Sequence, residues 1–153
     1  MAADSSIFTD MSNFFNEKLG KDHVSVSLTS MEEEQLVKKN IENFYKKLEE
    51  LGFNLDELKD ILDCRDSMLI LSGAGSGKTT ALILKIIRDL ISGDLIKTQV
   101  INGVKISTQA NILVSTFLKT GAEELEKSFN DWCRRLNLVG VNSNNIHFKT
   151  IHS

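Results

Sequence analysis

The sequence contains no proline, only two cysteines, and no apolar run of the roughly 18 residues that a membrane-spanning helix needs. Cys64 and Cys133 lie far apart and match no metal-ligand spacing, so we interpret them as two reduced thiols. No basic segment followed by an apolar core stands near the N-terminus, which argues against a signal peptide. Together these absences predict a cytoplasmic protein without a membrane span.

Positive charge is also not in excess. The formal net charge is −3 at pH 7, so no overall basic field indicates a nucleic-acid partner, although a groove can still be locally basic. The apolar and charged fractions, 41% and 25%, are ordinary for a globular domain, and the length of 153 residues suits one domain or part of one.

The chain does contain a glycine-rich loop, which separates an apolar run at residues 68–71 from a helical pattern that begins at Lys78. A strand, a glycine loop and a helix in this order are typical of a phosphate-binding loop. Gly73, Gly75 and Gly77 can adopt positive φ without a Cβ penalty, which lets successive backbone N–H groups point at one anion. The general form of this motif has a glycine at position 72, where this chain has Ser72.

The motif assigns roles to the residues of this loop. Lys78 is expected to reach the β- and γ-phosphates of a nucleotide, and the Thr79 hydroxyl to ligate Mg²⁺, so these two are the candidate catalytic residues. An ordinary glycine-rich turn that happens to precede a lysine is the alternative, and the flanking strand and helix patterns argue against it. The candidate nucleotide-binding residues are Ser72, Gly73, Ala74, Gly75, Ser76, Gly77, Lys78, Thr79 and Thr80.

The rest of the chain alternates helical and strand patterns. Capping patterns at Ser30 and Asn54 predict two helices before the loop, and Asn102-Gly103 predicts a β-hairpin inserted after the helix that follows the loop. The remaining expected elements are a weak helix in 1–22, an extended segment at 24–28, strands at 68–71, 111–116 and 146–150, and a helix at about 119–136.

This alternation predicts an α/β fold in which helices flank a parallel sheet. A mostly helical N-terminal extension, 1–53, would precede the α/β domain, 54–153. Ligands bind at the carboxyl ends of parallel strands. We therefore expect the loops at 72–79, 116–120 and 150–153 to gather at one edge of the sheet.

Three segments in this order resemble the UvrD/Rep-like branch of superfamily 1 DNA helicases. The phosphate loop, 72–79, has a small residue where this family commonly has one. Residues 112–117, followed by Ala-Glu-Glu-Leu at 122–125, look like motif Ia. Residues 148–153 look like motif Ib, and their Thr-Ile-His version also resembles the RecB/AddA-type helicase–nucleases. The resemblance covers roughly residues 54–153.

This resemblance implies a P-loop NTPase of RecA-like fold that uses ATP and Mg²⁺ to move single-stranded DNA, or DNA with a single-stranded tail, with 3′-to-5′ polarity. Phe117 would stack on a base, although alone it would more often be a core residue. The family's adenine-reading glutamine has Glu57 in its place, and Gln35 lies in a similar local setting. The implied DNA-binding residues are Thr116, Phe117, Lys119, Thr120, Thr150 and His152.

The resemblance also implies that residues 1–153 are the N-terminal part of a longer helicase. The family's Walker B carboxylates and arginine fingers follow motif Ib, so the remainder of the helicase polypeptide would be the partner of this segment. On its own the segment is expected to be inactive. Two alternatives remain open: another P-loop enzyme such as a small kinase, and a non-catalytic fragment that binds nucleotide or single-stranded DNA.

Overall fold

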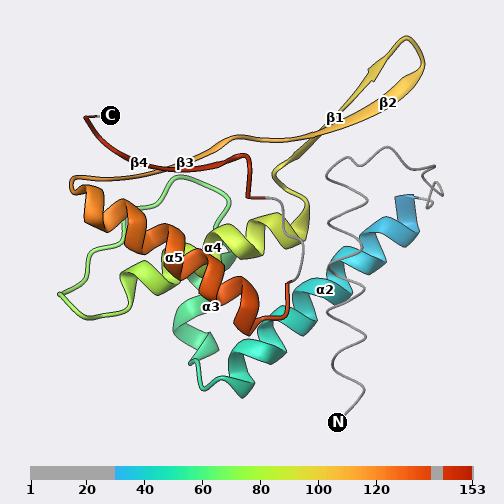
Figure 1. Ribbon diagram of the computed structural model, residues 1–153. Coiled ribbons are helices and arrows are strands. Elements are labelled where there is room, and N and C mark those ends of the chain that lie inside the picture. The colour runs from blue at the N-terminus through green and yellow to red at the C-terminus, as the bar shows by residue number, and fades with distance from the viewer. Residues whose placement is uncertain (1–29, 139–142, 153) are drawn as a thin grey trace.

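The computed structural model describes residues 30–138 and 143–152, except the side chain of Ser30. The expected elements at 1–22 and 24–28 lie outside these residues. None of the helices in the described ranges is long and apolar enough to cross a membrane. The elements in chain order are α2 (Ser30–Glu50), α3 (Leu55–Asp63), α4 (Lys78–Ser92), β1 (Ile96–Ile101), β2 (Val104–Gln109), β3 (Ile112–Thr116), α5 (Lys119–Arg135) and β4 (Ile146–Thr150) (Figure 1).

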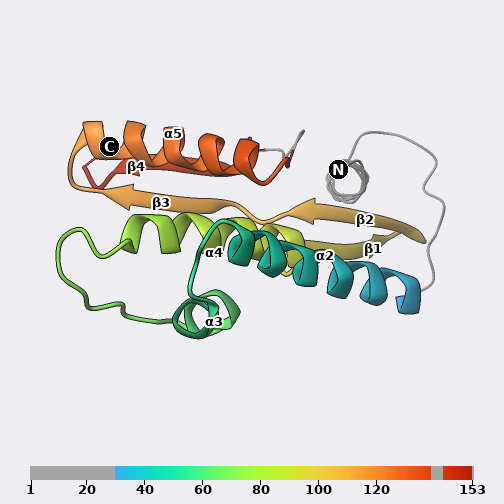
Figure 2. The same ribbon diagram turned by 90° about the horizontal axis from the view of Figure 1, so that it is seen from below.

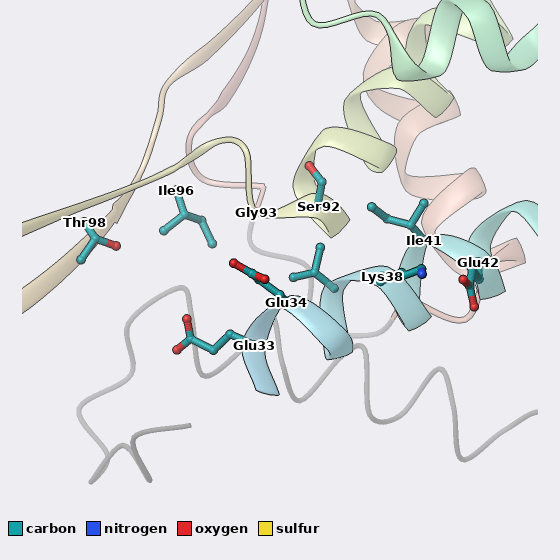
Figure 3. A pocket seen from close by; sticks show the side chains of 10 residues that line it. Glu33, Glu34, Lys38, Ile41, Glu42, Ser92, Gly93, Ile96 and Thr98 are labelled. Atoms are coloured by element: carbon teal, nitrogen blue, oxygen red, sulfur yellow. The ribbon is translucent and has the colours of Figure 1, made fainter. Parts of the chain in front are cut away.

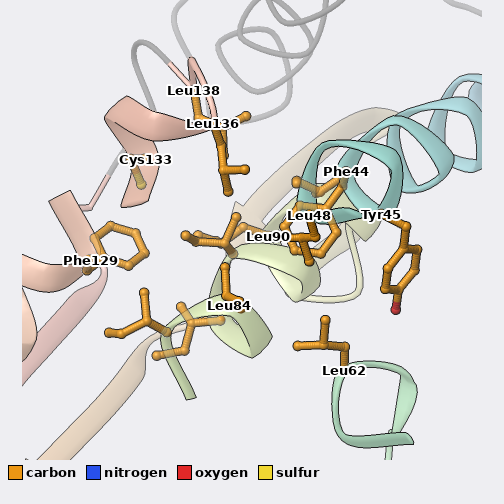
Figure 4. Close-up of a cluster of buried hydrophobic side chains, with 14 of the residues drawn as sticks. Phe44, Tyr45, Leu48, Leu62, Leu84, Leu90, Phe129, Cys133, Leu136 and Leu138 are labelled. Atoms are coloured by element: carbon orange, nitrogen blue, oxygen red, sulfur yellow. The ribbon is translucent and has the colours of Figure 1, made fainter. Parts of the chain in front are cut away.

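Helix α4 is the centre of the packing, because α2, α3 and α5 all contact it (Figures 1 and 4). Its apolar residues recur around most of its circumference, which is the pattern of a buried helix. The largest fully buried side chains come from all four helices and the turn after α5: Phe44, Leu48, Leu62, Ile83, Leu84, Ile87, Ile91, Phe129 and Leu136.

The helix ends follow from local residues, as the sequence predicted. Gly52, at φ 91°, lies two residues after the last residue of α2, and the Phe53 N–H donates to the Leu48 carbonyl at 3.0 Å. Asn54 caps α3, because its side-chain oxygen accepts a hydrogen bond from the Asp56 N–H at 3.1 Å. The Glu57 side chain does not accept the reciprocal hydrogen bond from the Asn54 N–H that would complete a capping box.

The predicted hairpin around Asn102-Gly103 is present. β1 and β2 pair antiparallel from Ile96–Gln109 to Ile101–Val104. The turn is made by Asn102, at φ 53°, and Gly103, at φ 79°, the left-handed conformations that a tight hairpin turn requires. The hairpin extends away from the helices (Figure 1). It is therefore an insertion that leaves the packing around α4 undisturbed.

The two later strands form a parallel pair. β3 and β4 run in register from Ile112–Ile146 to Thr116–Thr150, as the predicted α/β order requires. Helix α5 packs on one face of this pair, where Val114 is buried and Phe148 lies near Phe129, with 6.0 Å between ring centroids. Parallel sheets bind ligands at the carboxyl ends of their strands, and β3 and β4 end side by side.

The prediction of a strand at residues 68–71 is wrong. This segment has no regular secondary structure and pairs with no strand in the described residues, and Leu69 and Leu71 are 82% and 84% exposed. A strand needs a neighbour that pairs with its backbone groups, and in the described residues β3 and β4 pair only with each other. The described part of the chain is therefore a mixed α/β structure with two small sheets, rather than one continuous parallel sheet.

Candidate nucleotide site and strand edge

The glycine-rich loop is open to solvent, since every residue from Ser72 to Thr79 is exposed. Gly75 and Gly77 have φ of 76° and 82°, in the left-handed region that costs other residues about 1–2 kcal/mol. Gly73, the third glycine of the loop, does not have a positive φ. The loop thus turns at two glycines, and the second of them is the N-cap of α4.

Lys78 folds back over the loop instead of extending into solvent. Its Nζ donates to the carbonyl oxygens of Ser72 at 2.8 Å and Gly73 at 2.7 Å. The Ser76 hydroxyl donates to the same Gly73 carbonyl at 2.7 Å and lies 2.8 Å from the Ser72 hydroxyl. These bonds hold the ammonium group against the loop, where it can neutralise a bound anion.

The N-terminus of α4 supplies further donors for an anion. Gly77 offers no capping side chain, and the first intrahelical bond runs from the Ala81 N–H to the Gly77 carbonyl at 2.9 Å. The N–H groups of Lys78, Thr79 and Thr80 therefore have no acceptor within the helix. These groups and the positive end of the helix dipole suit a phosphate group.

Thr79 lies in this first turn and offers a hydroxyl oxygen, a ligand type that Mg²⁺ accepts. In the described ranges, no three or more His, Cys, Asp or Glu side chains gather into a group that could hold a metal ion. Thr79 therefore suits Mg²⁺ that is held chiefly by nucleotide phosphates and water.

A cavity of about 470 Å³ adjoins the loop and lies between α3, the first turn of α4, and α5. Its aromatic wall is Trp132, which has the Arg135 guanidinium 4.9 Å from its ring centroid and the Phe53 ring at 5.5 Å. Gln35 does not line this cavity. The lining residues are Leu51, Phe53, Asn54, Glu57, Leu58, Ile61, Ser76, Gly77, Thr80, Ala81, Trp132 and Arg135.

A second cavity, of about 640 Å³, lies at the opposite end of α4, between α2 and the base of the hairpin. Figure 3 shows Glu34 extending from α2 toward Gly93 and Ile96. The 15 residues of α4 separate this cavity from the phosphate loop by about 20 Å. It therefore does not belong to the candidate nucleotide site.

The second part of the candidate site is the carboxyl end of β3 and β4 with the turns that follow, which we call the strand edge. Thr116 lies opposite Thr150, and the Ile151 N–H donates to the Thr116 carbonyl at 3.0 Å. A Cβ added at Gly121 would meet the Thr116 hydroxyl oxygen at 3.0 Å, so α5 starts unusually close to this edge. Phe117 follows β3 with 76% of its surface exposed.

The other predicted DNA-binding residues lie on the same two turns. Lys119, Thr120 and His152 are exposed, and Lys119 forms a long surface ion pair with Glu123, at 3.9 Å. Figures 1 and 2 both place the phosphate loop, the turn before α5 and the end of β4 at one end of the molecule. The three loops predicted to gather at one edge therefore lie at the same end.

The family model for the UvrD/REP helicase N-terminal domain matches residues 53–153, which include the phosphate loop and the strand edge. The chain belongs to the UvrD/REP helicase family. The resemblance inferred from three sequence motifs is thereby confirmed. No curated protein and no solved structure is similar enough to the chain to count as a match.

Sequence reasoning missed two residues of the candidate nucleotide site of this UvrD/REP family member. The sequence motifs gave no site role to Trp132 or Arg135, yet both line the cavity beside the loop. Their spacing of three on one helix was the available signal, because residues at i and i+3 share a helix face. Nothing local indicated that this face of α5 would meet α3 and the start of α4.

Proposed function

We propose that this chain binds Mg²⁺–ATP at Ser72–Thr80 and single-stranded DNA at the carboxyl edge of β3 and β4, as part of the motor of an ATP-dependent DNA helicase or translocase. The observation that carries the proposal is the start of α4. There, unpaired N–H groups, the helix dipole and the Lys78 ammonium converge on one exposed loop. Family membership favours a RecA-like motor and 3′-to-5′ movement.

The two parts of the site have different roles in this proposal. Lys78 and the α4 N-terminus bind phosphates, while Thr79 ligates Mg²⁺, which neutralises phosphate charge when bound. At the strand edge, Phe117 stacks on a base, and Thr116, Lys119, Thr120, Thr150 and His152 contact the DNA backbone. Helix α4 begins at the nucleotide and α5 begins at the DNA edge, so their contact provides a direct route between the two ligands.

Hydrolysis also requires a carboxylate that orients the attacking water. We propose that the rest of the helicase polypeptide supplies this group, as in the family pattern. The 153-residue chain would then bind nucleotide and single-stranded DNA without turning ATP over.

The test is a titration of the 153-residue chain with a fluorescent ATP analogue in the presence of Mg²⁺. Lys78→Ala should weaken binding by roughly 10- to 100-fold, because hydrogen bonds to charged groups contribute about 1.5–3 kcal/mol. Lys127→Ala, which removes an exposed lysine on α5, is the matched control and should bind like the wild type. Equal binding by wild type and Lys78→Ala would contradict the proposal.

A further inference from the structure

The β1–β2 hairpin projects from the helical body and is exposed along most of its length (Figure 1). Every residue of β1 after Ile96 is exposed. Near the turn, four aliphatic side chains are 42–68% exposed: Val100, Ile101, Val104 and Ile106. None of the four belongs to the hydrophobic core around α4. A cluster of exposed apolar side chains of this kind is typical of an interaction surface.

The charge of the hairpin indicates the kind of partner. The chain is acidic overall, yet none of its 21 aspartates and glutamates lies between residues 95 and 122, the stretch that forms β1, β2, β3 and the first residues of α5. The charged residues of this stretch are Lys97 and Lys105 on the hairpin and Lys119 at the strand edge. Within residues 30–138 and 143–152, neither hairpin lysine forms an ion pair. The hairpin is therefore locally cationic and suits a polyanion.

The two faces of the hairpin differ, because side chains alternate along a strand. At the base of one face, Ile96 and Thr98 line the second cavity together with Glu33 and Glu34 of α2. The opposite face, which we call the open face, has polar side chains near the base and aliphatic side chains near the turn. Its cross-strand pairs are Lys97–Thr108, Gln99–Ile106 and Ile101–Val104.

A two-stranded β-ribbon of this kind fits the major groove of double-stranded DNA. Lys97 and Lys105 are three residue pairs apart, roughly 10 Å along the strands, which is close to the ~12 Å width of that groove. The two ammonium groups can therefore meet phosphates on both strands that border one groove. Lysines on edge strands also oppose the addition of another protein strand, so the charges favour DNA over a protein partner.

We propose that the β1–β2 hairpin binds double-stranded DNA, with Lys97 and Lys105 on phosphates and the aliphatic end of the open face in the groove. This surface is distinct from the strand edge, because the five residues of β3, roughly 17 Å long, separate the two. A DNA with a single-stranded tail would then place its tail at the strand edge and its duplex at the hairpin. Only this simultaneous binding rests on the proposed function.

The experiment measures, by fluorescence anisotropy, the binding of a labelled blunt duplex of about two helical turns and of a labelled oligothymidine. The first variant combines Lys97→Gln and Lys105→Gln. The second replaces 97–108 by Asn-Gly, which joins the paired residues Ile96 and Gln109. The control combines Lys39→Gln and Lys46→Gln, which make the same charge change on the exposed side of α2.

Loss of the two hairpin lysines should weaken duplex binding by roughly 10- to 100-fold at about 0.1 M salt, because each phosphate contact releases ~0.9 counterion. For the same reason, the slope of log affinity against log salt should become shallower by about 2. Replacement of 97–108 should abolish measurable duplex binding. The control should change duplex affinity by less than about threefold, and all four proteins should bind oligothymidine equally.

The results separate this inference from the proposed function. A wild-type chain that binds oligothymidine but not the duplex overturns the inference and leaves the proposed function intact. Hairpin-dependent duplex binding in a chain that does not bind oligothymidine supports the inference and contradicts single-strand binding at the strand edge. Equal losses in the two lysine pairs, or a parallel loss of oligothymidine binding, show general charge attraction, and the inference is then wrong.

Sedimentation of the same proteins tests the rival occupant, a second copy of the chain. If the duplex does not bind, and the wild type forms dimers that the 97–108 replacement abolishes, the hairpin is a protein contact and the inference is wrong. A monomeric wild type whose duplex affinity depends on the hairpin supports it.

Discussion

At the scale of single residues, Phe117 is the most unusual side chain of the proposed DNA edge. A phenylalanine normally buries its ring, yet this one is 76% exposed directly after β3. The adjoining Leu118, 68% exposed, has comparable apolar surface but no aromatic face. The pair therefore allows base stacking to be distinguished from general apolar contact.

We predict that Phe117→Ala weakens binding of a labelled oligothymidine by roughly 5- to 100-fold, because stacking of one base contributes about 1–3 kcal/mol. Leu118→Ala should change the affinity by less than about threefold. Fluorescence anisotropy titrations at a fixed salt concentration measure both affinities. If the two variants lose affinity equally, Phe117 does not stack on a base.

At the scale of elements, one buried arginine joins three helices. Arg88 of α4 is 5% exposed, and its guanidinium lies 3.1 Å from Asp63 of α3 and 3.2 Å from Asp94, which follows α4. Tyr45 of α2 donates to the same Asp63 carboxylate. Burial, the hydrogen bond and the negative charge of Asp63 raise the pKa of Tyr45 well above its ordinary value, so the phenol remains a donor.

We predict that Arg88→Ala lowers the free energy of unfolding by about 2–3 kcal/mol, because it removes the buried cation that lies between Asp63 and Asp94 at the helix junction. This value is below that for a fully buried pair, since the Asp63 and Asp94 side chains are 48% and 36% exposed. The control is Arg134→Ala, which removes an exposed pair with Asp131 and should cost less than about 0.5 kcal/mol. Urea denaturation measures both, and equal losses would contradict the role given to Arg88.

At the scale of the whole molecule, the hairpin and the helical body are nearly separate. β1 and β2 make extensive contacts only with each other in the described part of the chain, and the Ala110 N–H to Leu95 carbonyl bond, at 2.6 Å, closes the hairpin base. The core residues around α4 come from the helices, β3, β4 and short connecting turns. The hairpin therefore contributes little to the stability of the body.

We predict that replacing 97–108 by Asn-Gly shifts the thermal midpoint by less than about 4 °C, which corresponds to roughly 1 kcal/mol in a domain of this size. The new turn would join the paired residues Ile96 and Gln109 in the same way that the natural turn joins Ile101 and Val104. Calorimetry measures the midpoint. Nucleotide affinity should also be unchanged, and a large loss of either would show that the hairpin supports the body.

The sequence by itself determined the features that depend on a few neighbouring residues. Asn54 and Gly52 set helix ends, and Asn102-Gly103 sets the hairpin turn, because caps and turns form within four or five residues. The helical spacing of apolar residues predicted α4 and α5, and the order of three short motifs was enough for the UvrD/REP helicase family.

Only the tertiary structure decided which distant segments meet. The apolar run at 68–71 has the composition of a strand, but it lacks a neighbouring strand and is unpaired. Glu57 shares a cavity with Trp132 and Arg135 because α3 and α5 both pack on α4, and Arg88 meets Asp63 for the same reason. Such contacts depend on how whole faces of helices are buried together, and local sequence does not encode that partner choice.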